Sequence, residues 1–243
     1  MNLNKDAFLE KMEAGLKQIN IPYSDEQLDQ LWEYYTFFLA ENKKYNLSSI
    51  TEMDEAVKKH FLDSLVILPH VEVKKKKRWI DIGTGAGFPG MVLKIFLPGD
   101  SFYLIDSSSK KVNFLMQLIY KLDLQGIKAA HGRAEDLANE EGWRAGFDYA
   151  TSRAVASLNI LLEYTVPFLK IGGTAYLYKG PEYEAEINEA QNALEVLGAE
   201  VKDAVELNVP GLEAERYLLI IEKTRKTPQK YPRRPGMPKK RPL

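Results

Sequence analysis

The chain has 243 residues, of which 33 are Lys or Arg and 34 are Asp or Glu, and it contains no cysteine. This length suits one domain of moderate size with an appendage, and a content of 45% hydrophobic and 28% charged residues is typical of a soluble globular protein. The absence of cysteine excludes a disulfide framework, thiolate metal sites and a cysteine nucleophile.

The net charge of −1 hides an uneven distribution along the chain. Residues 223–243 contain nine basic and no acidic side chains, which leaves residues 1–222 with 24 basic and 34 acidic side chains and a net charge of −10. Five prolines in the same segment prevent a continuous helix, and the segment holds little to bury. We therefore predict an extended, flexible tail. Such a tail either keeps the protein soluble or binds phosphates through counterion release, and the embedded Tyr231 favours RNA.

Residues 1–70 are predicted to form an N-terminal helical region. The first helix is indicated by apolar residues at helical spacing, namely Phe8, Met12, Leu16 and Ile19. Ser24 is a favourable N-cap for a second helix, and Gln27 completes a capping box. A third helix is expected over residues 53–68, and Pro69 ends it.

From residue 79 the sequence changes to short apolar runs that alternate with longer amphipathic ones. Seven strands are expected, at residues 79–83, 102–105, 127–130, 147–151, 173–178, 201–207 and 217–221. Helices are expected at residues 89–97, 109–122, 134–140, 157–170 and 182–197. Strands separated by helices predict a parallel sheet covered on both faces, and ligands of such sheets bind beyond the carboxyl ends of the strands.

A turn at residues 208–211, NVPG, joins the last two strands without a helix, so the sheet is predicted to end in an antiparallel hairpin. An α/β fold with a seven-stranded mixed sheet and a terminal hairpin is the layout of class I, Rossmann-like methyltransferases that use S-adenosylmethionine. This domain would cover residues 71–222, between the helical region and the basic tail at residues 223–243.

A glycine-rich loop, DIGTGAGFPG at residues 81–90, follows the first strand of the predicted sheet. Glycines let the backbone turn tightly there and approach a ligand closely. Gly85, Gly87 and Gly90 also satisfy the G-x-G-x-x-G pattern, so a dinucleotide-binding enzyme is the alternative to a methyltransferase.

Two residues of the loop favour S-adenosylmethionine over a dinucleotide. Asp81 precedes the glycines inside the strand, where its carboxylate can order the loop and meet the amino acid end of the cofactor. Pro89 removes an amide donor where a pyrophosphate needs one. Asp106, at the end of the second strand, could accept hydrogen bonds from ribose hydroxyls in either class.

The loops after the third and fourth strands complete the predicted site. The backbone amide of Ala134 and the side chain of Glu135 could address the adenine edge, although acids are favoured at any helix N-terminus. Arg153 follows the fourth strand. As a fixed cation it can hold a phosphate, a carboxylate or a guanine edge, but it cannot act as a base.

The missing motifs narrow the predicted reaction. There is no N-P-P-Y or D-P-P-Y motif for methylation of an exocyclic amine, and no cysteine for covalent attack on a pyrimidine. The target should therefore be intrinsically nucleophilic. Guanine N7 fits this requirement, because it is an unprotonated lone pair and catalysis then reduces to alignment.

Several further motifs complete the pattern, namely YNLSSI at 45–50, HFLDS at 60–64, IDS at 105–107, RAE at 133–135, SRA at 152–154, LYKG at 177–180, Glu215-Arg216 and YPRRPG at 231–236. With the glycine loop, they make the chain resemble the small-subunit ribosomal RNA guanine-N7 methyltransferase family, called RsmG or GidB, over essentially its whole length. The tail resembles that of the longer members, and shorter members lack it.

The resemblance implies the cofactor, the target and the residues that bind them. It implies S-adenosylmethionine contacts from Gly83, Phe88, Asp106, Ala134, Glu135 and Arg153, to which the loop analysis adds Asp81, Gly85 and Gly87. Arg153 would also position the substrate. The implied partner is 16S rRNA, the small ribosomal subunit or an assembly intermediate, with a target guanine at position 527 in helix 18, the 530 loop.

The candidates for RNA contacts are Asn46, Lys179, Arg233 and Arg234. Asn46 could instead cap a turn, and Lys179 could be an ordinary solvated lysine. His60 and Asp63 lie three residues apart, and either face the cofactor cleft or form a buried polar pair that ties the helical region to the sheet.

Other partners and functions follow from what the sequence lacks or leaves open. The three histidines show no metal-ligand spacing, so we predict no metal. Without a signal peptide or a long apolar run, a cytoplasmic protein with no membrane partner is expected, and we expect a monomer. Two other functions stay open at this point, an RNA-binding module without catalysis and a small-molecule methyltransferase.

Overall fold

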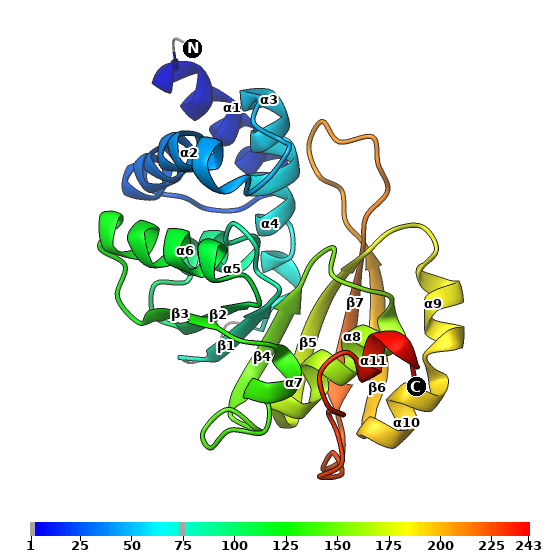
Figure 1. Cartoon of the computed structure of the whole chain (residues 1–243). Coiled ribbons are helices and arrows are strands. Elements are labelled where there is room, and N and C mark those ends of the chain that lie inside the picture. The colour runs from blue at the N-terminus through cyan, green and yellow to red at the C-terminus, as the bar shows by residue number, and fades with distance from the viewer. Residues whose placement is uncertain (1–2, 73–75) are drawn as a thin grey trace.

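A seven-stranded sheet forms the centre of the chain, which the computed structural model describes over residues 3–72 and 76–243 (Figure 1). Its strands are β1 (Arg78–Ile82), β2 (Ser101–Asp106), β3 (Ile127–His131), β4 (Phe147–Ser152), β5 (Leu169–Lys179), β6 (Ala199–Glu206) and β7 (Tyr217–Lys223). The strand order is β3-β2-β1-β4-β5-β7-β6, in which β1 to β5 are parallel and β7 runs antiparallel to both of its neighbours. The predicted mixed sheet with a terminal hairpin is confirmed.

Helices precede the sheet and separate most of its strands. They are α1 (Lys5–Gln18), α2 (Asp25–Tyr45), α3 (Met53–Ala56), α4 (Asp63–Leu65), α5 (Gly90–Phe96), α6 (Ser109–Lys121), α7 (Ala134–Leu137), α8 (Leu158–Thr165), α9 (Tyr183–Glu189), α10 (Gln191–Leu197) and α11 (Met237–Lys240). A π-helical turn, η1 (Val57–Leu62), joins α3 to α4, so the helix predicted at 53–68 is present in pieces. The helix predicted at 182–197 is likewise divided, because Ala190 interrupts it.

The start of α2 follows from local side-chain chemistry. The Ser24 hydroxyl accepts a hydrogen bond from the Gln27 amide, and the Gln27 side chain accepts one from the Ser24 amide. The predicted capping box is therefore confirmed. Residues 1–2 of the predicted helical region and 73–75 of the predicted methyltransferase domain lie outside the described residues. Within the described ranges, none of the helices has the length and apolar character that crossing a membrane requires.

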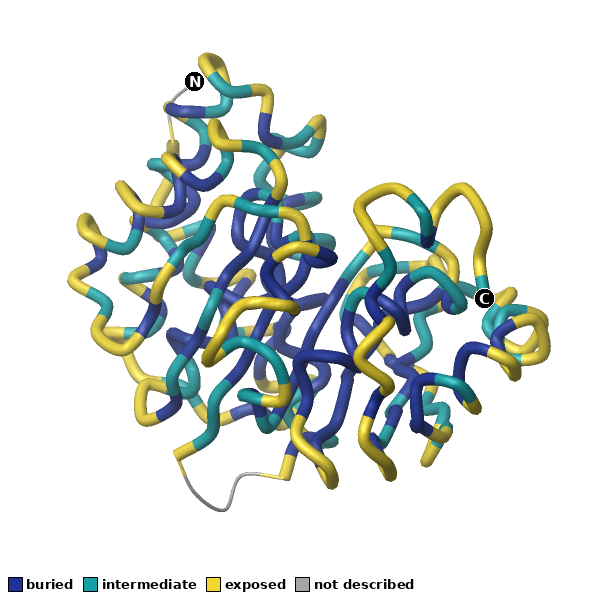
Figure 2. The backbone as a smooth tube through the Cα atoms, turned by 60° about the horizontal axis from the view of Figure 1, so that its bottom comes forward, coloured by how far each residue is buried: buried dark blue, intermediate teal, exposed yellow. Residues whose placement is uncertain are grey.

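Alternating side chains of the strands supply two hydrophobic cores, one on each face of the sheet. Trp79 and Phe102 belong to the core that contains α5, α6 and the N-terminal helices. Ile80 and Leu177 belong to the other core, with α8 and α10. The tube in Figure 2 shows the buried strands running through the middle of the molecule. This alternation has the period of two that strands impose, with both faces covered.

The basic tail differs from the prediction of an extended, flexible arm. Figure 1 shows the chain turning back after β7, so that α11 lies beside α8. The side chain of Arg233 makes an ion pair with Glu163 of α8, whose side chain is 0% exposed, and Tyr231 is buried in the core on that face. The prediction of an extended arm was wrong because a sequence rich in proline and charge can still dock when the body supplies a buried carboxylate, Glu163, and a guanidinium, Arg144.

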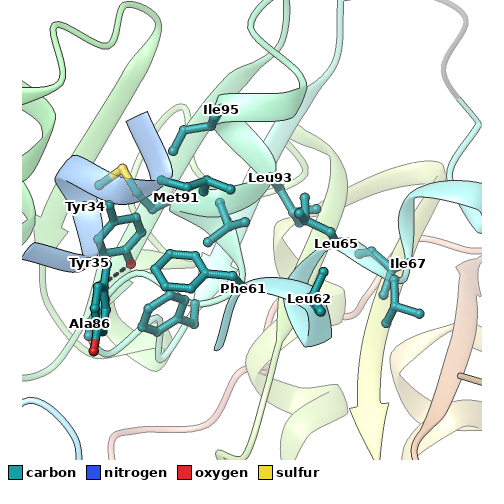
Figure 3. Close-up of a cluster of buried hydrophobic side chains, with 14 of the residues drawn as sticks. Tyr34, Tyr35, Phe61, Leu62, Leu65, Ile67, Ala86, Met91, Leu93 and Ile95 are labelled. Atoms are coloured by element: carbon teal, nitrogen blue, oxygen red, sulfur yellow. Dashed lines mark hydrogen bonds between the residues drawn. The ribbon is translucent and has the colours of Figure 1, made fainter. Parts of the chain in front are cut away.

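One hydrogen bond connects the N-terminal helices to the glycine loop between β1 and α5. The hydroxyl of Tyr34 in α2 donates to the carbonyl oxygen of Ala86 over 2.5 Å, drawn as a dashed line in Figure 3. Tyr34 is 0% exposed, and its ring makes an edge contact with Phe61. The helical region is therefore part of the structure that supports the loop.

We predict that Tyr34→Phe destabilises the protein by about 1–3 kcal/mol, because it leaves the Ala86 carbonyl without its donor in a dry environment. Urea denaturation followed by circular dichroism measures the free energy of unfolding. Tyr120→Phe is the matched control, since Tyr120 is 86% exposed and its hydroxyl should contribute little. Equal stabilities for the two variants would contradict this role of Tyr34.

Candidate functional site

The Asp81 carboxylate holds the glycine loop in place. One oxygen accepts a hydrogen bond from the Gly90 amide at 2.9 Å and the other accepts one from the Thr151 hydroxyl at 3.1 Å. Burial raises the pKa of the Asp81 carboxyl above its usual range, and these hydrogen bonds oppose that rise. Asp81 is only 1% exposed and acts on the loop, which is the first of the two roles that the sequence predicted for it.

The glycines of the loop are needed for different structural reasons. A Cβ at Gly87, where φ is +104°, would lie 2.6 Å from the Tyr34 hydroxyl, so the helical region forces a glycine there. Gly85 has a φ of +62° and a Cβ on it would meet only the Gly83 carbonyl oxygen at 4.0 Å. The loop is therefore tight at Gly87 and open at Gly85, where a ligand could approach the backbone.

Asp106 ends β2 directly beside the loop. Its two carboxylate oxygens accept hydrogen bonds from the amides of Gly85 at 3.0 Å and Ser108 at 2.8 Å, and the residue is 7% exposed. Each oxygen keeps a lone pair for another donor, so this oriented carboxylate can accept bonds from two neighbouring hydroxyls.

Ala134 and Glu135 open α7 at the next strand end. Both are buried, and the Glu135 carboxylate accepts a hydrogen bond from the Gly236 amide of the tail at 3.0 Å. Apart from Arg153, which follows β4, the predicted cofactor residues thus lie at or just beyond the carboxyl ends of β1, β2 and β3, which adjoin in the sheet. An open glycine turn, an oriented carboxylate and a second carboxylate beyond it could hold the amino acid, ribose and adenine parts of the S-adenosylmethionine that the resemblance implies.

A cavity of about 550 Å³ lies beside this row, between the sheet edge and the helical region. The loop lines it with Gly83, Gly85 and Phe88, and the helical region contributes a second wall with His60 and Asp63. The remaining charged lining residues are Lys59, Arg153, Lys179, Glu186 and Arg216. His60 and Asp63 therefore face the cleft, which was one of the two expectations for them, and both are also buried, as in the other expectation.

Asp63 and Arg153 join the two walls of the cavity. A guanidinium nitrogen of Arg153 lies 2.5 Å from one Asp63 oxygen, and Arg216 Nε lies 3.6 Å from the other. The guanidinium also lies 5.7 Å from the ring centroids of Phe88 and Tyr178. Because Asp63 is only 3% exposed, breaking one pair would leave a buried charge less well compensated.

Phe88 is stacked against two rings from the helical region. The His60 ring lies parallel to it at 4.4 Å, and Tyr34 lies parallel to it at 5.1 Å. Burial, and after it the positive charge of Arg153, together lower the pKa of His60 from 6.5 to about 4. The imidazole is therefore neutral near pH 7 and is a weak base.

The predicted RNA contacts have different surroundings in the structure. Asn46 is the C-cap of α2 in the left-handed conformation, which fits the capping alternative, and its side chain is exposed. Lys179 is 8% exposed and pairs with Glu186 at 2.6 Å, so it is not an ordinary solvated lysine. Arg233 is held by Glu163, whereas Arg234 is exposed.

Sequence reasoning missed several of these contacts. Tyr34, Glu163 and Glu186 carried no motif, and the only signal for Arg216 was its place in the Glu215-Arg216 pair. Among the residues the structure describes, no group of three or more His, Asp or Glu side chains could hold a metal ion.

The chain is similar to known proteins over nearly its full length. The family model for rRNA small subunit methyltransferase G, GidB, matches residues 27–217. Ribosomal RNA small subunit methyltransferase G of Desulfitobacterium hafniense is 47% identical over 228 residues, which cover 93% of this chain and 94% of that protein. The protein of the same name from Alkaliphilus metalliredigens is 44% identical over 232 residues, which cover 96% and 97%.

Solved structures with much lower identity share the fold. M. jannaschii TYW2, in complex with AdoMet, has a TM-score of 0.53 at 15% identity and covers 67% of this chain and 74% of its own. TrmN from Thermus thermophilus has a TM-score of 0.52 at 17% identity and covers 66% and 48%.

We predict that stability falls as the pH drops from about 6.5 to about 4 because of His60. Its pKa is lower in the folded state than in the unfolded state, so the unfolded chain binds the extra proton first and acid favours unfolding. The contribution of His60 to the free energy of unfolding is fully present above pH 6.5. About 3 kcal/mol of it is lost when the pH reaches the folded-state pKa of about 4. Urea denaturation at a series of pH values measures it.

The His60→Gln variant should flatten this part of the pH profile, since it removes the titrating ring. His131→Gln removes an exposed ring and should leave the profile as it is. The same acid sensitivity in both variants would assign the effect to other groups.

Proposed function

Since the chain belongs to the rRNA small subunit methyltransferase G family, we propose that it methylates N7 of a guanine in 16S rRNA with S-adenosylmethionine as the methyl donor. Family membership makes it an rRNA methyltransferase that acts on small-subunit RNA. The finer proposal is that the guanine is the one at position 527 in helix 18.

We choose guanine N7 as the target atom because the described cleft contains no suitable base. Two carboxylates line the described cavity, and both are committed: Asp63 pairs with Arg153, and Glu186 pairs with Lys179. The neutral His60, with a pKa of about 4, accepts protons poorly at pH 7. This environment supports a nucleophile that needs no deprotonation, and guanine N7 meets that condition.

The side chains of the cleft would act by binding and orientation. S-adenosylmethionine supplies an electrophilic methyl group when it is bound. Asp106 would accept ribose hydroxyls, and Glu135 with the Ala134 amide would bind the adenine. Arg153 would hold the guanine edge or a phosphate next to the face of Phe88, and Asp63 keeps that guanidinium in one orientation.

A deletion strain tests the proposed function directly. Its 16S rRNA should lack one N7-methylguanine that the parent carries, and the intact gene should restore it. A labelled-methyl assay with purified 16S rRNA, small subunits and cell metabolites then separates an RNA substrate from a small molecule. The proposal would be wrong if the deletion left every N7-methylguanine in place.

We predict that Arg153→Ala, made together with Asp63→Asn, lowers the rate of RNA methylation on the order of a hundredfold through lost alignment. The second substitution removes the buried charge that Arg153→Ala alone would leave behind. Arg153→Lys with Asp63 intact is the control, since it keeps the charge and loses the planar fork, and it should retain an intermediate rate. Full activity in the double variant would show that Arg153 does not contribute to methylation.

The exposed cations of the tail are proposed to bind RNA phosphates, and Arg233 is not among them. Replacing Arg234, Lys239, Lys240 and Arg241 by alanine should weaken RNA binding most at low salt. Each lost phosphate contact should reduce the slope of log affinity against log salt by about 0.7. Filter binding over a salt series measures the slope, with Lys121→Ala on α6 as control. An unchanged slope would show that these four side chains do not bind RNA phosphates.

A further inference from the structure

The C-terminal segment reaches the cofactor site through one hydrogen bond. Gly236, in the turn before α11, donates its amide hydrogen to the Glu135 carboxylate over 3.0 Å. Gly236 is the N-cap of α11 with a φ of +82°, a conformation that suits glycine. The segment comes from 101 residues further along the chain, yet it contacts a side chain in the row of predicted cofactor residues.

A buried ion pair fixes the segment just before this contact. Glu163 of α8 accepts hydrogen bonds from the Arg233 backbone amide at 2.7 Å, from Arg233 Nε at 2.9 Å and from Arg233 Nη2 at 2.6 Å. The Glu163 side chain is 0% exposed, so its charge depends on this partner. Removing the arginine would leave a buried charge and release the segment.

A second arginine holds the start of the segment. Arg144, in the loop before β4, donates to the carbonyl oxygens of Tyr231 at 2.8 Å, Pro228 at 3.1 Å and Thr227 at 3.2 Å. The two contacts differ in which partner donates the hydrogen bonds. At Arg233 the body accepts them with the Glu163 carboxylate, and at the tail carbonyls the body donates them from the Arg144 guanidinium. Residues 227–236 are therefore specified by side chains of the body at both ends.

From these contacts we infer that the C-terminal segment is a positioning element of the cofactor site, with Arg233 and Gly236 acting through Glu135. This inference rests on the proposed function, in which Glu135 binds the adenine of S-adenosylmethionine. A glutamate at the start of a four-residue helix has several rotamers open to it. A carboxylate already held in one of them loses less conformational freedom when its ligand binds.

The effect must be reciprocal. If docking of the segment raises the affinity for S-adenosylmethionine, then S-adenosylmethionine must strengthen docking of the segment by the same factor. The Gly236 amide gives a way to see this, because its hydrogen bond to Glu135 slows hydrogen exchange only while the segment is docked. Bound cofactor should slow that exchange further.

Calorimetric titration of the full chain with S-adenosylmethionine tests the inference. Arg233→Ala should weaken binding about tenfold, a change of about 1.4 kcal/mol, and should raise the KM for the cofactor with little change in kcat. The exposed Lys226→Ala removes one positive charge directly before residues 227–236 and should bind as the unmodified chain does. Circular dichroism checks that each variant is folded.

A second variant covers the case in which Arg233→Ala does not fold. Glu163→Gln combined with Arg233→Gln leaves no buried charge and still loses the ion pair, so it should show the same loss of affinity. Cofactor should also slow hydrogen exchange of the Gly236 amide in the unmodified chain and do so less in this variant.

Three results would overturn the inference. Equal affinities for the ion-pair variants and the unmodified chain would leave the segment with a structural role only. Tighter binding in the variants would mean that Gly236 competes with the cofactor for Glu135. If S-adenosylmethionine did not bind to the unmodified chain, both the proposed function and this inference would be wrong.

Discussion

The buried Asp81 carboxylate is the interaction on which the rest of the site depends. It lies at the centre of the sheet and binds the Gly90 amide at the start of α5 and the Thr151 hydroxyl of β4. Burying a carboxylate is unfavourable unless hydrogen bonds compensate for the lost hydration, and these two donors provide part of that compensation. Because both ends of the glycine loop are tied to one side chain, the loop has a defined path between them.

That path determines where the other groups of the site can lie. It places the Gly85 amide against Asp106 and presents Phe88 to His60 and Arg153. The helical region then adds a constraint from outside, since Tyr34 binds the Ala86 carbonyl and leaves no room for a Cβ at Gly87. The loop is specified from the sheet on one side and from α2 on the other, which explains why a region outside the α/β domain contributes to the site.

Local patterns in the sequence predicted the local features of the structure. The seven strands, the terminal hairpin and the capping box at Ser24 were predictable because each depends on neighbouring residues. The tail could not be predicted in the same way. Arg233 finds its partner 70 residues earlier, and nothing in its own segment indicates that Glu163 is buried. The pairing of Arg153 with Asp63, 90 residues apart, was missed for the same reason, although both residues were recognised individually.

Charge pairing also reduces the number of tail charges that are free to bind a phosphate. Counting residues 223–243 as nine free positive charges overstates what a phosphate would meet, because Arg233 is neutralised by Glu163 and Lys223 is buried against backbone carbonyls. The acidic body has likewise used two of its carboxylates, Glu163 and Glu135, to bind the tail. The two ends of the chain thus act on opposite ends of the same row of loops, with His60 packed on Phe88 and Gly236 bonded to Glu135. Segments outside the sheet, on both sides of it in sequence, thus contact the proposed site at the ends of β1, β2 and β3, and we infer that its geometry depends on both of them being docked.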